Sequence, residues 1–359
     1  MPPLTRTTSP RVRRRGRPYI AWAAFGLLAT SALGYACQLA ATKRDRRRFP
    51  APGRLVDIGG LGLHLDVAGD DRGKPTVVLE AGLGSFSPNW HWVQLALADE
   101  LRVVSYDRAG LGWSDPSPEP RDANTMAGEL HTALHHAGIT GPYVLAGHSF
   151  GGLVVRAFAD AYRPEVAGLV LVDASHPDQW ARWPVPYAHR LQVLSLTVMA
   201  ALARVGLFRV ANPFGAVSAG LPAQQVAELN ARFAVPQTSS VEAEQMREWE
   251  RTTRPLLHRA APLGDLPLAV IGVGVQPLGA ETLDALQQEL PGLSTNSARR
   301  VIADATHESL IAERGNATRV VDAILAVVDA ADGERVETAW SAREAHRSSR
   351  DRADTAIAR

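Results

Sequence analysis

The sequence predicts an α/β fold, in which a mainly parallel sheet is flanked by helices and carries one helical insertion. Short apolar runs alternate with stretches of helical pattern, as in parallel sheets that are covered on both faces. The interval 177–262 interrupts this rhythm with helical, aromatic-rich sequence, and we expect it to form a cap over the site. The predicted strands are Leu61–Val67, Thr76–Leu79, Arg102–Tyr106, Tyr143–Ala146, Val166–Val172, Leu268–Val273 and Arg300–Ala303.

The composition is that of a globular protein, with 46% apolar and 21% charged residues among 359. The net charge of +1 conceals a basic end, because residues 1–54 carry twelve Lys or Arg and one acidic residue. Nucleic-acid binding calls for basic residues on the folded body, so no nucleic-acid partner is expected. Cys37 is the only cysteine, which excludes an intramolecular disulfide.

The basic end surrounds an apolar run that is long enough to cross a membrane. Residues 1–18 are rich in Pro and Arg and are expected to be disordered, whereas 19–42 hold no formal charge. A helix of that length covers the roughly 30 Å hydrocarbon core of a bilayer, and the basic cluster 43–48 ends it. A cleaved signal peptide, the alternative, usually has a shorter apolar region. We therefore expect an uncleaved, single-pass anchor with membrane lipid as its partner. Positive charge on both flanks leaves its orientation open.

The folded domain is expected to cover residues 54–330, followed by a tail. Residues 333–359 mix charges of both signs and have little apolar content. Such composition is typical of disordered segments, so we expect this tail to be unpacked.

The clearest local motif is Gly147-His148-Ser149-Phe150-Gly151, which lies between a strand and a helical stretch at 153–162. A nucleophile in this position occupies a tight, strained turn, and glycines on either side remove Cβ atoms that would collide there. The motif therefore predicts Ser149 as a nucleophile. A glycine-rich turn that holds an incidental serine is the alternative.

With this turn, residues 54–330 resemble the α/β-hydrolase superfamily. Glu80-Ala81-Gly82-Leu83-Gly84 is similar to the family's oxyanion loop, and Asp107-Arg108-Ala109-Gly110-Leu111-Gly112-Trp113-Ser114 to its loop after the next strand. The resemblance makes 166–172 the sixth strand, so the cap follows the sixth strand. We expect Asp107 and Arg108 to tie their loop to its neighbours rather than to catalyse.

The resemblance also implies an oxyanion hole and a base. The family pattern places the two donors at the backbone N–H groups of Leu83 and Phe150. It places the base at His307, after the last strand and before a final helix. His148 and His176 are rivals, but the side chain of His148 should point away from Ser149 on the strained turn.

The acid is less clear. Most family members carry it after the seventh strand, where residues 274–278 of this chain offer no carboxylate. A minority carry it after the sixth, where Asp173 stands, so Asp173 is predicted to orient His307. Glu281, Asp284 and Asp178 remain alternatives, and Asp173 could instead cap its loop.

These residues imply a serine hydrolase of the esterase or lipase type that acts through an acyl-enzyme, without cofactor or metal. No His/Cys cluster with metal-ligand spacing is identified. A cofactor-free perhydrolase or haloperoxidase is one rival, and a binding protein that retains the triad is another. Epoxide hydrolases and dehalogenases of the family use an aspartate where this chain has Ser149. The cap helix within 191–210 carries only two charges, so it is expected to pack on the domain and in part to line a pocket for apolar ester substrates.

Overall fold

The computed structural model describes residues 18–211, 214–275 and 279–357; the predicted disordered segment 1–18 lies almost wholly outside this range. Its centre is a single eight-stranded sheet in the order β1-β2-β4-β3-β5-β6-β7-β8. β1 and β2 pair antiparallel with each other and β2 with β4, whereas all other pairs are parallel. The strands are β1 (Arg54–Asp57), β2 (Gly62–Ala68), β3 (Thr76–Glu80), β4 (Val103–Tyr106), β5 (Tyr143–His148), β6 (Val166–Val172), β7 (Leu268–Val273) and β8 (Ser297–Ile302).

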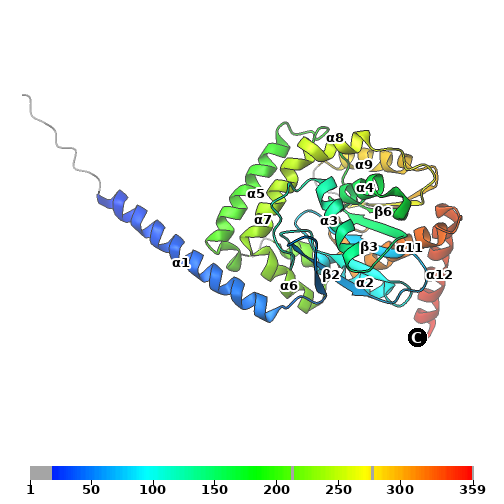
Figure 1. Ribbon diagram of the computed structural model, residues 1–359, viewed down its shortest axis with the longest axis horizontal. Coiled ribbons are helices and arrows are strands. Elements are labelled where there is room, and N and C mark those ends of the chain that lie inside the picture. The colour runs from blue at the N-terminus through cyan, green and yellow to red at the C-terminus, as the bar shows by residue number, and fades with distance from the viewer. Residues whose placement is uncertain (1–17, 212–213, 276–278, 358–359) are drawn as a thin grey trace, which may run out of the picture.

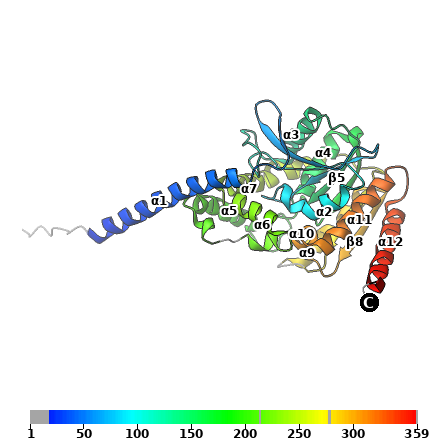
Figure 2. The same ribbon diagram turned by 90° about the horizontal axis from the view of Figure 1, so that it is seen from below.

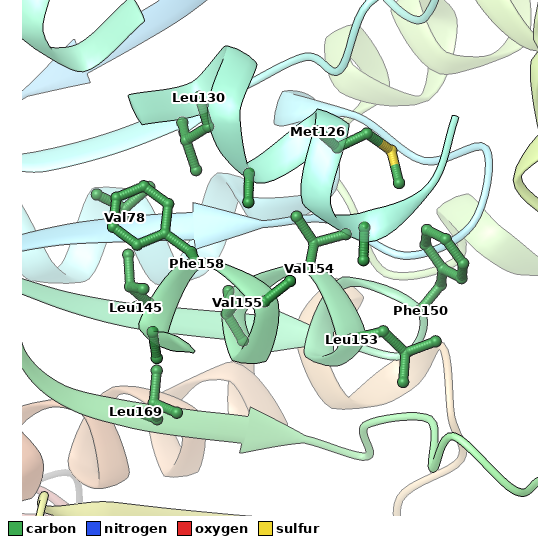
Figure 3. Close-up of a cluster of buried hydrophobic side chains, with 14 of the residues drawn as sticks. Val78, Met126, Leu130, Leu145, Phe150, Leu153, Val154, Val155, Phe158 and Leu169 are labelled. Carbon is green, nitrogen blue, oxygen red and sulfur yellow. The ribbon is translucent and has the colours of Figure 1, made fainter. Parts of the chain in front are cut away.

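Helices cover both faces of this sheet, because alternate side chains of each buried strand point to opposite faces. On one face, α3 (Ala123–His136) and α4 (Gly151–Ala161) pack on Val78, Leu145 and Leu169 (Figure 3). On the other, α2 (His91–Leu97) and α11 (Arg314–Ala330) pack on the strand side chains that alternate with these, including Val77 and Val144. Figure 2 shows α2 and α11 on the side of the sheet opposite α3 and α4. The prediction of a mainly parallel sheet flanked by helices is therefore confirmed.

The cap is the block of helices between β6 and β7. It contains α5 (Ala188–Arg204), α6 (Ala223–Phe233), α7 (Pro236–Glu248) and α8 (Arg254–Arg259). A π-helical turn at Trp249–Thr253 joins α7 to α8. Figure 1 shows this block beside the sheet, on the side from which α1 emerges. After β7, α9 (Ala280–Glu289) leads to β8, and the short α10 (Ser309–Ala312) precedes α11.

The helix α1 (Pro18–Arg48) contains the predicted anchor and continues through the basic cluster. Its part from Trp22 to Arg48 is long and apolar enough to cross a membrane, although a signal sequence meets the same criterion. The C-terminal half of α1 contacts the cap: the Gln38 side chain donates to the Ala234 carbonyl at 2.9 Å, and Arg209 pairs with Asp45. The N-terminal half projects away from the body (Figure 1).

The prediction of an unpacked tail is wrong for the described part of residues 333–359. Residues 336–357 form the helix α12, which packs against α11. Three side chains, Val336, Ala339 and Trp340, are buried on one face at helical spacing. Ion pairs add to this contact, including Arg343 with Asp329 at 2.8 Å. The mean hydropathy of this segment is low, so its composition does not reveal the three apolar residues that pack α12 against the domain.

Candidate active site

Ser149 lies on a strained turn at the C-terminal end of β5. Its φ of +54° falls in the left-handed region that side chains other than glycine rarely adopt. Its N–H donates to the Val172 carbonyl at 3.1 Å, and its own carbonyl accepts from the N–H groups of Gly152 and Ser175. A Cβ at Gly147 would lie 2.7 Å from the Gly151 carbonyl oxygen, so the turn requires glycine there. The surrounding backbone thus holds Ser149 in a conformation that it would not adopt alone.

The adjacent strand β6 ends in a second strained residue. Asp173 has a φ of +40°, and its N–H donates to the Ile271 carbonyl at 2.7 Å. This backbone turns the Asp173 carboxylate toward His307, whose Nδ1 lies 2.5 Å from Oδ2. Burial opposes protonation of His307, but the hydrogen bond and the charge of Asp173 outweigh it and raise the pKa of His307. The structure therefore joins the predicted base and the predicted acid.

His148 supports His307 rather than Ser149. Its Nε2 donates to the backbone carbonyl of His307 at 3.0 Å, and the two rings lie 4.6 Å apart. Burial is the main reason why the pKa of His148 falls to about 3, and the nearby His307 lowers it further. His148 is therefore neutral and holds the His307 loop in place. Among the described residues, no hydrogen bond yet joins Ser149 to His307.

The other candidate acids and bases have different partners or lie apart from this pair. Asp178 accepts from Arg254 at 2.7 Å and contacts His258 at 2.8 Å. Asp284 pairs with Arg299 at 2.9 Å, and Glu281 is exposed near the start of α9. The Nδ1 of His176 accepts from the N–H of Asp178, two residues further on. None of these side chains contacts His307 within the described structure.

The predicted oxyanion donors are free. Neither the N–H of Leu83 nor that of Phe150 donates to another described residue. The loop passes directly beside Ser149, since a Cβ built on Gly82 would lie 3.2 Å from the Ser149 Cβ and 3.7 Å from its Oγ. Two unpaired N–H groups next to a serine hydroxyl can bind a negatively charged oxygen.

A buried ion pair sets the shape of the oxyanion loop. Arg108 pairs with Glu80 at 2.5 Å, and its guanidinium also donates to the backbone carbonyls of Ala81 and Gly82. The Tyr106 hydroxyl donates to the same Glu80 carboxylate. Because the Gly82 carbonyl and the Leu83 N–H belong to the same planar peptide group, Arg108 fixes the direction in which the Leu83 N–H points. Asp107 binds the N–H groups of Ser87 and Trp113 at 2.8 and 2.9 Å, which agrees with the structural role expected for both residues.

The cap packs directly on this machinery. Trp249 is buried against Phe150, the residue after Ser149, with 5.6 Å between the ring centroids. Glu242 of α7 lies over the oxyanion loop: a Cβ on Gly84 would come within 1.7 Å of its Oε1. The Glu242 side chain has no hydrogen-bond partner among the described residues. Burial raises its pKa to about 7, although the charge of Arg108 opposes this. The sequence analysis did not identify this carboxyl group.

The helix α5 differs from the expectation for residues 191–210. It buries only Leu196, Ala200 and Ala203. Val193 and Met199 are partly buried against the same core. Four other apolar side chains form an exposed stripe at helical spacing: Leu191, Leu194, Val198 and Leu202 are 59%, 58%, 47% and 38% exposed. These four residues, which we call the α5 stripe, face outward. The expectation that part of 191–210 lines a substrate pocket stays a prediction. The expectation that this helix packs on the domain therefore holds for one of its faces.

Comparison with known proteins agrees with this architecture. Residues 75–212 match the family model for the alpha/beta hydrolase fold. An "AB hydrolase superfamily protein" of Gibberella zeae is 36% identical over 120 residues, which are 32% of this chain and 37% of that protein. The chain spans only 20–49% of the length of the first curated relatives that it matches.

Two solved structures illustrate the range of the fold. A thermophilic esterase from Thermogutta terrifontis has a TM-score of 0.57 and 24% identity, over 77% of this chain and 98% of the esterase. The epoxide hydrolase CorEH has a TM-score of 0.55 and 20% identity, over 73% of this chain and 93% of that one. The sheet, the strained serine turn and the family match define one class of fold: the chain has the α/β-hydrolase fold, and its residues 75–212 match that family.

Proposed function

We propose that this protein is a serine hydrolase that cleaves ester substrates through an acyl-enzyme. The observation that carries the proposal is the strained Ser149 turn beside the His307–Asp173 pair, with the free N–H groups of Leu83 and Phe150 next to it. Acyl transfer needs a nucleophile, a base that is held in the correct tautomer, and two oxyanion donors. Asp173 at Nδ1 leaves Nε2 of His307 available as the base.

In the proposed reaction the Ser149 oxygen attacks the ester carbonyl carbon while His307 Nε2 takes its proton. The N–H groups of Leu83 and Phe150 stabilise the tetrahedral oxyanion. Collapse of this intermediate breaks the bond to the alcohol oxygen, which receives the proton from His307. Water then attacks the acyl-enzyme with His307 as base, and the acid and free Ser149 are released. Asp173 stabilises the imidazolium in both halves.

Labelling with a fluorophosphonate probe tests the nucleophile. Ser149→Ala should abolish labelling and ester hydrolysis while the protein remains folded by circular dichroism. Ser175→Ala is the matched control, because Ser175 is buried at the end of the next strand, and it should still be labelled. Undiminished labelling of Ser149→Ala would reject the assignment. Ester turnover that is negligible beside peroxide-dependent halogenation would instead favour the perhydrolase alternative.

We further propose that α1 is a single-pass anchor and that the α5 stripe rests on the bilayer. The two surfaces are continuous: a Cβ on Gly34 of α1 would lie 2.3 Å from the carbonyl oxygen of Val205, which directly follows α5. Beyond this contact, residues 22–33 of α1 are almost entirely exposed although apolar. Apolar side chains on a free surface next to a candidate span are best covered by hydrocarbon. Substrates with apolar acyl chains would then reach the site from the membrane.

Two experiments test the proposed contact with the membrane: carbonate extraction of the full chain, and a comparison of esters embedded in vesicles with a soluble ester. The full chain should resist carbonate extraction. Leu194→Ser with Val198→Ser should lower activity on long-chain esters embedded in vesicles but leave activity on a short soluble ester unchanged. Val301→Ser on β8 is the control, because Val301 is also exposed but lies in the sheet. Full-length chain in the soluble fraction would contradict the anchor, and equal loss on both substrates would contradict contact with the bilayer.

A further inference from the structure

Two histidines and one glutamate converge on the surface of the domain away from Ser149. His131 and His135 lie on α3, four residues apart, and Glu165 lies in the short turn before β6. The Nε2 of His131 lies 2.9 Å from Oε1 of Glu165, and the Nε2 of His135 lies 2.9 Å from Oε2 of the same carboxylate. One nitrogen or oxygen from each of the three residues lies within 4.8 Å of the others. Two imidazoles thus share a single carboxylate.

The donor set and its dimensions suit a zinc ion. Histidines at i and i+4 present their rings on one face of a helix, and zinc takes imidazole nitrogen and carboxylate oxygen as ligands. Tetrahedral bonds of about 2.0–2.1 Å place neighbouring ligand atoms roughly 3.3 Å apart. The two nitrogen–oxygen separations of 2.9 Å lie close to this value, and all three ligand atoms lie within 4.8 Å of one another, so only small side-chain movements are needed to admit the ion. A water molecule would supply the fourth ligand.

The ligands are held before any ion binds. The ring of His131 stacks on Tyr162 with 3.7 Å between centroids and an interplanar angle of 2°. The N–H of Glu165 donates to the carbonyl of the same Tyr162 at 2.9 Å. One residue therefore positions a ligand on α3 and a ligand in the turn before β6. Rings and backbone that are already fixed lose little conformational freedom when a ligand binds.

We propose that His131, His135 and Glu165 form a zinc-binding site that cross-links α3 to the turn before β6. Glu165 precedes the N-terminal end of β6, whereas Asp173 follows its C-terminal end, so the site lies at the edge of the sheet opposite the catalytic residues. The site is therefore separate from the proposed hydrolase active site, and its ligation does not involve the residues proposed for ester hydrolysis. The sequence analysis missed it because the third ligand lies 30 residues from the second and only folding brings it close.

Zinc titration of the full-length, untagged protein in detergent tests the site. After the protein is stripped with a chelator, calorimetry should show one saturable zinc ion per chain, and zinc should raise the melting temperature. His131→Ala and His135→Ala should each weaken binding at least about tenfold, because loss of a ligand should cost no less than loss of an outer-shell partner. Glu165→Gln should also weaken it, since an amide is a poorer zinc ligand.

His136→Ala is the matched control. His136 lies on the same helix, but its Nδ1 contacts the backbone carbonyl of Asp57 instead of Glu165. This variant should bind zinc and melt in its presence as the wild type does. No saturable binding by the wild type would overturn the proposal. Unchanged affinity in both His131→Ala and His135→Ala, or equal weakening in His136→Ala, would overturn it as well.

Discussion

The edge of the sheet at Ser149 and the cap above it are built in different ways. At the edge, backbone geometry places the functional groups, since Ser149 and Asp173 are held at positive φ at the ends of neighbouring strands. Each is fixed by hydrogen bonds to the strand beside it. In the cap, side chains define the surface: Trp249 packs on Phe150, and Glu242 packs on Gly84. At the edge, the backbone of the strand ends therefore positions the functional groups, whereas in the cap side-chain packing positions them.

This contrast separates two kinds of expected effect. Changes at the edge should reduce turnover steeply while the fold survives, because they remove groups that act on reacting atoms or on His307. Changes in the cap should alter stability and its pH dependence, because the cap buries an ionisable group beside the oxyanion loop. The predictions below test this division, beginning with the largest effect.

Asp173→Asn should lower kcat by about 10⁴, as loss of the acid does in a related triad. An amide cannot stabilise the imidazolium that forms on His307. The measurement is steady-state ester hydrolysis by protein whose fold is confirmed by circular dichroism. Asp284→Asn is the matched control, because its carboxylate pairs with Arg299 on the surface, and its kcat should stay within severalfold. Near-normal turnover by Asp173→Asn would place the acid elsewhere.

Arg108→Met should destabilise the protein by about 3–5 kcal/mol, because it leaves Glu80 buried without its partner. It should also lower kcat by roughly 10²–10³ if the loop that carries Leu83 loses its orientation. Thermal unfolding and ester hydrolysis measure the two effects. Arg299→Met breaks an exposed pair with Asp284 and should cost no more than about 1 kcal/mol. Similar losses in both variants would contradict a special role for the buried pair.

Glu242→Gln should be more stable than the wild type at pH 8 by up to about 3 kcal/mol, but not at pH 4. The pKa of Glu242 is about 7 in the folded protein against 4.5 ordinarily, so the folded state retains a proton that the unfolded state releases. Wild-type stability should therefore fall as pH rises from about 4.5 to about 7. Unfolding free energies across this range measure the effect. Glu281→Gln, at an exposed side chain near the start of α9, is the control and should show no such difference.

Features that are encoded by a continuous stretch of sequence could be predicted. Strands β3 to β7 begin and end within about two residues of their predicted limits, because buried parallel strands appear as continuous apolar runs. The strand β1 was missed, since Arg54–Asp57 is short and mostly exposed. Ser149 and its turn could be predicted because the motif is contiguous. The pairing of His307 with Asp173 could be anticipated only through the family resemblance.

Features that depend on distant contacts could not be predicted. Glu242 is one glutamate in a polar helix until folding places it over Gly84. The outward direction of the α5 stripe depends on which face packs on α7, and a helix that is apolar on nearly all sides does not reveal this. Likewise, α12 docks through Trp340 and two smaller side chains that mean composition obscures.

The smallest expected effect is a shift in the pH profile of ester hydrolysis. This profile distinguishes titration of His307, at the sheet edge, from titration of Glu242, in the cap. His307 acts as a base only when neutral, so kcat/KM should fall about tenfold per unit as pH drops below the pKa of His307. Because Asp173 raises that pKa, the midpoint should lie above the ordinary 6.5 of histidine. Glu242 titrates near 7 and could distort the wild-type profile, so the measurement is best made in Glu242→Gln. If His307 governs the reaction, this variant should keep the midpoint, whereas residual activity in Asp173→Asn should show a lower one. If the midpoint of the kcat/KM profile disappears in Glu242→Gln but persists in the other variants, the pH dependence belongs to Glu242 in the cap.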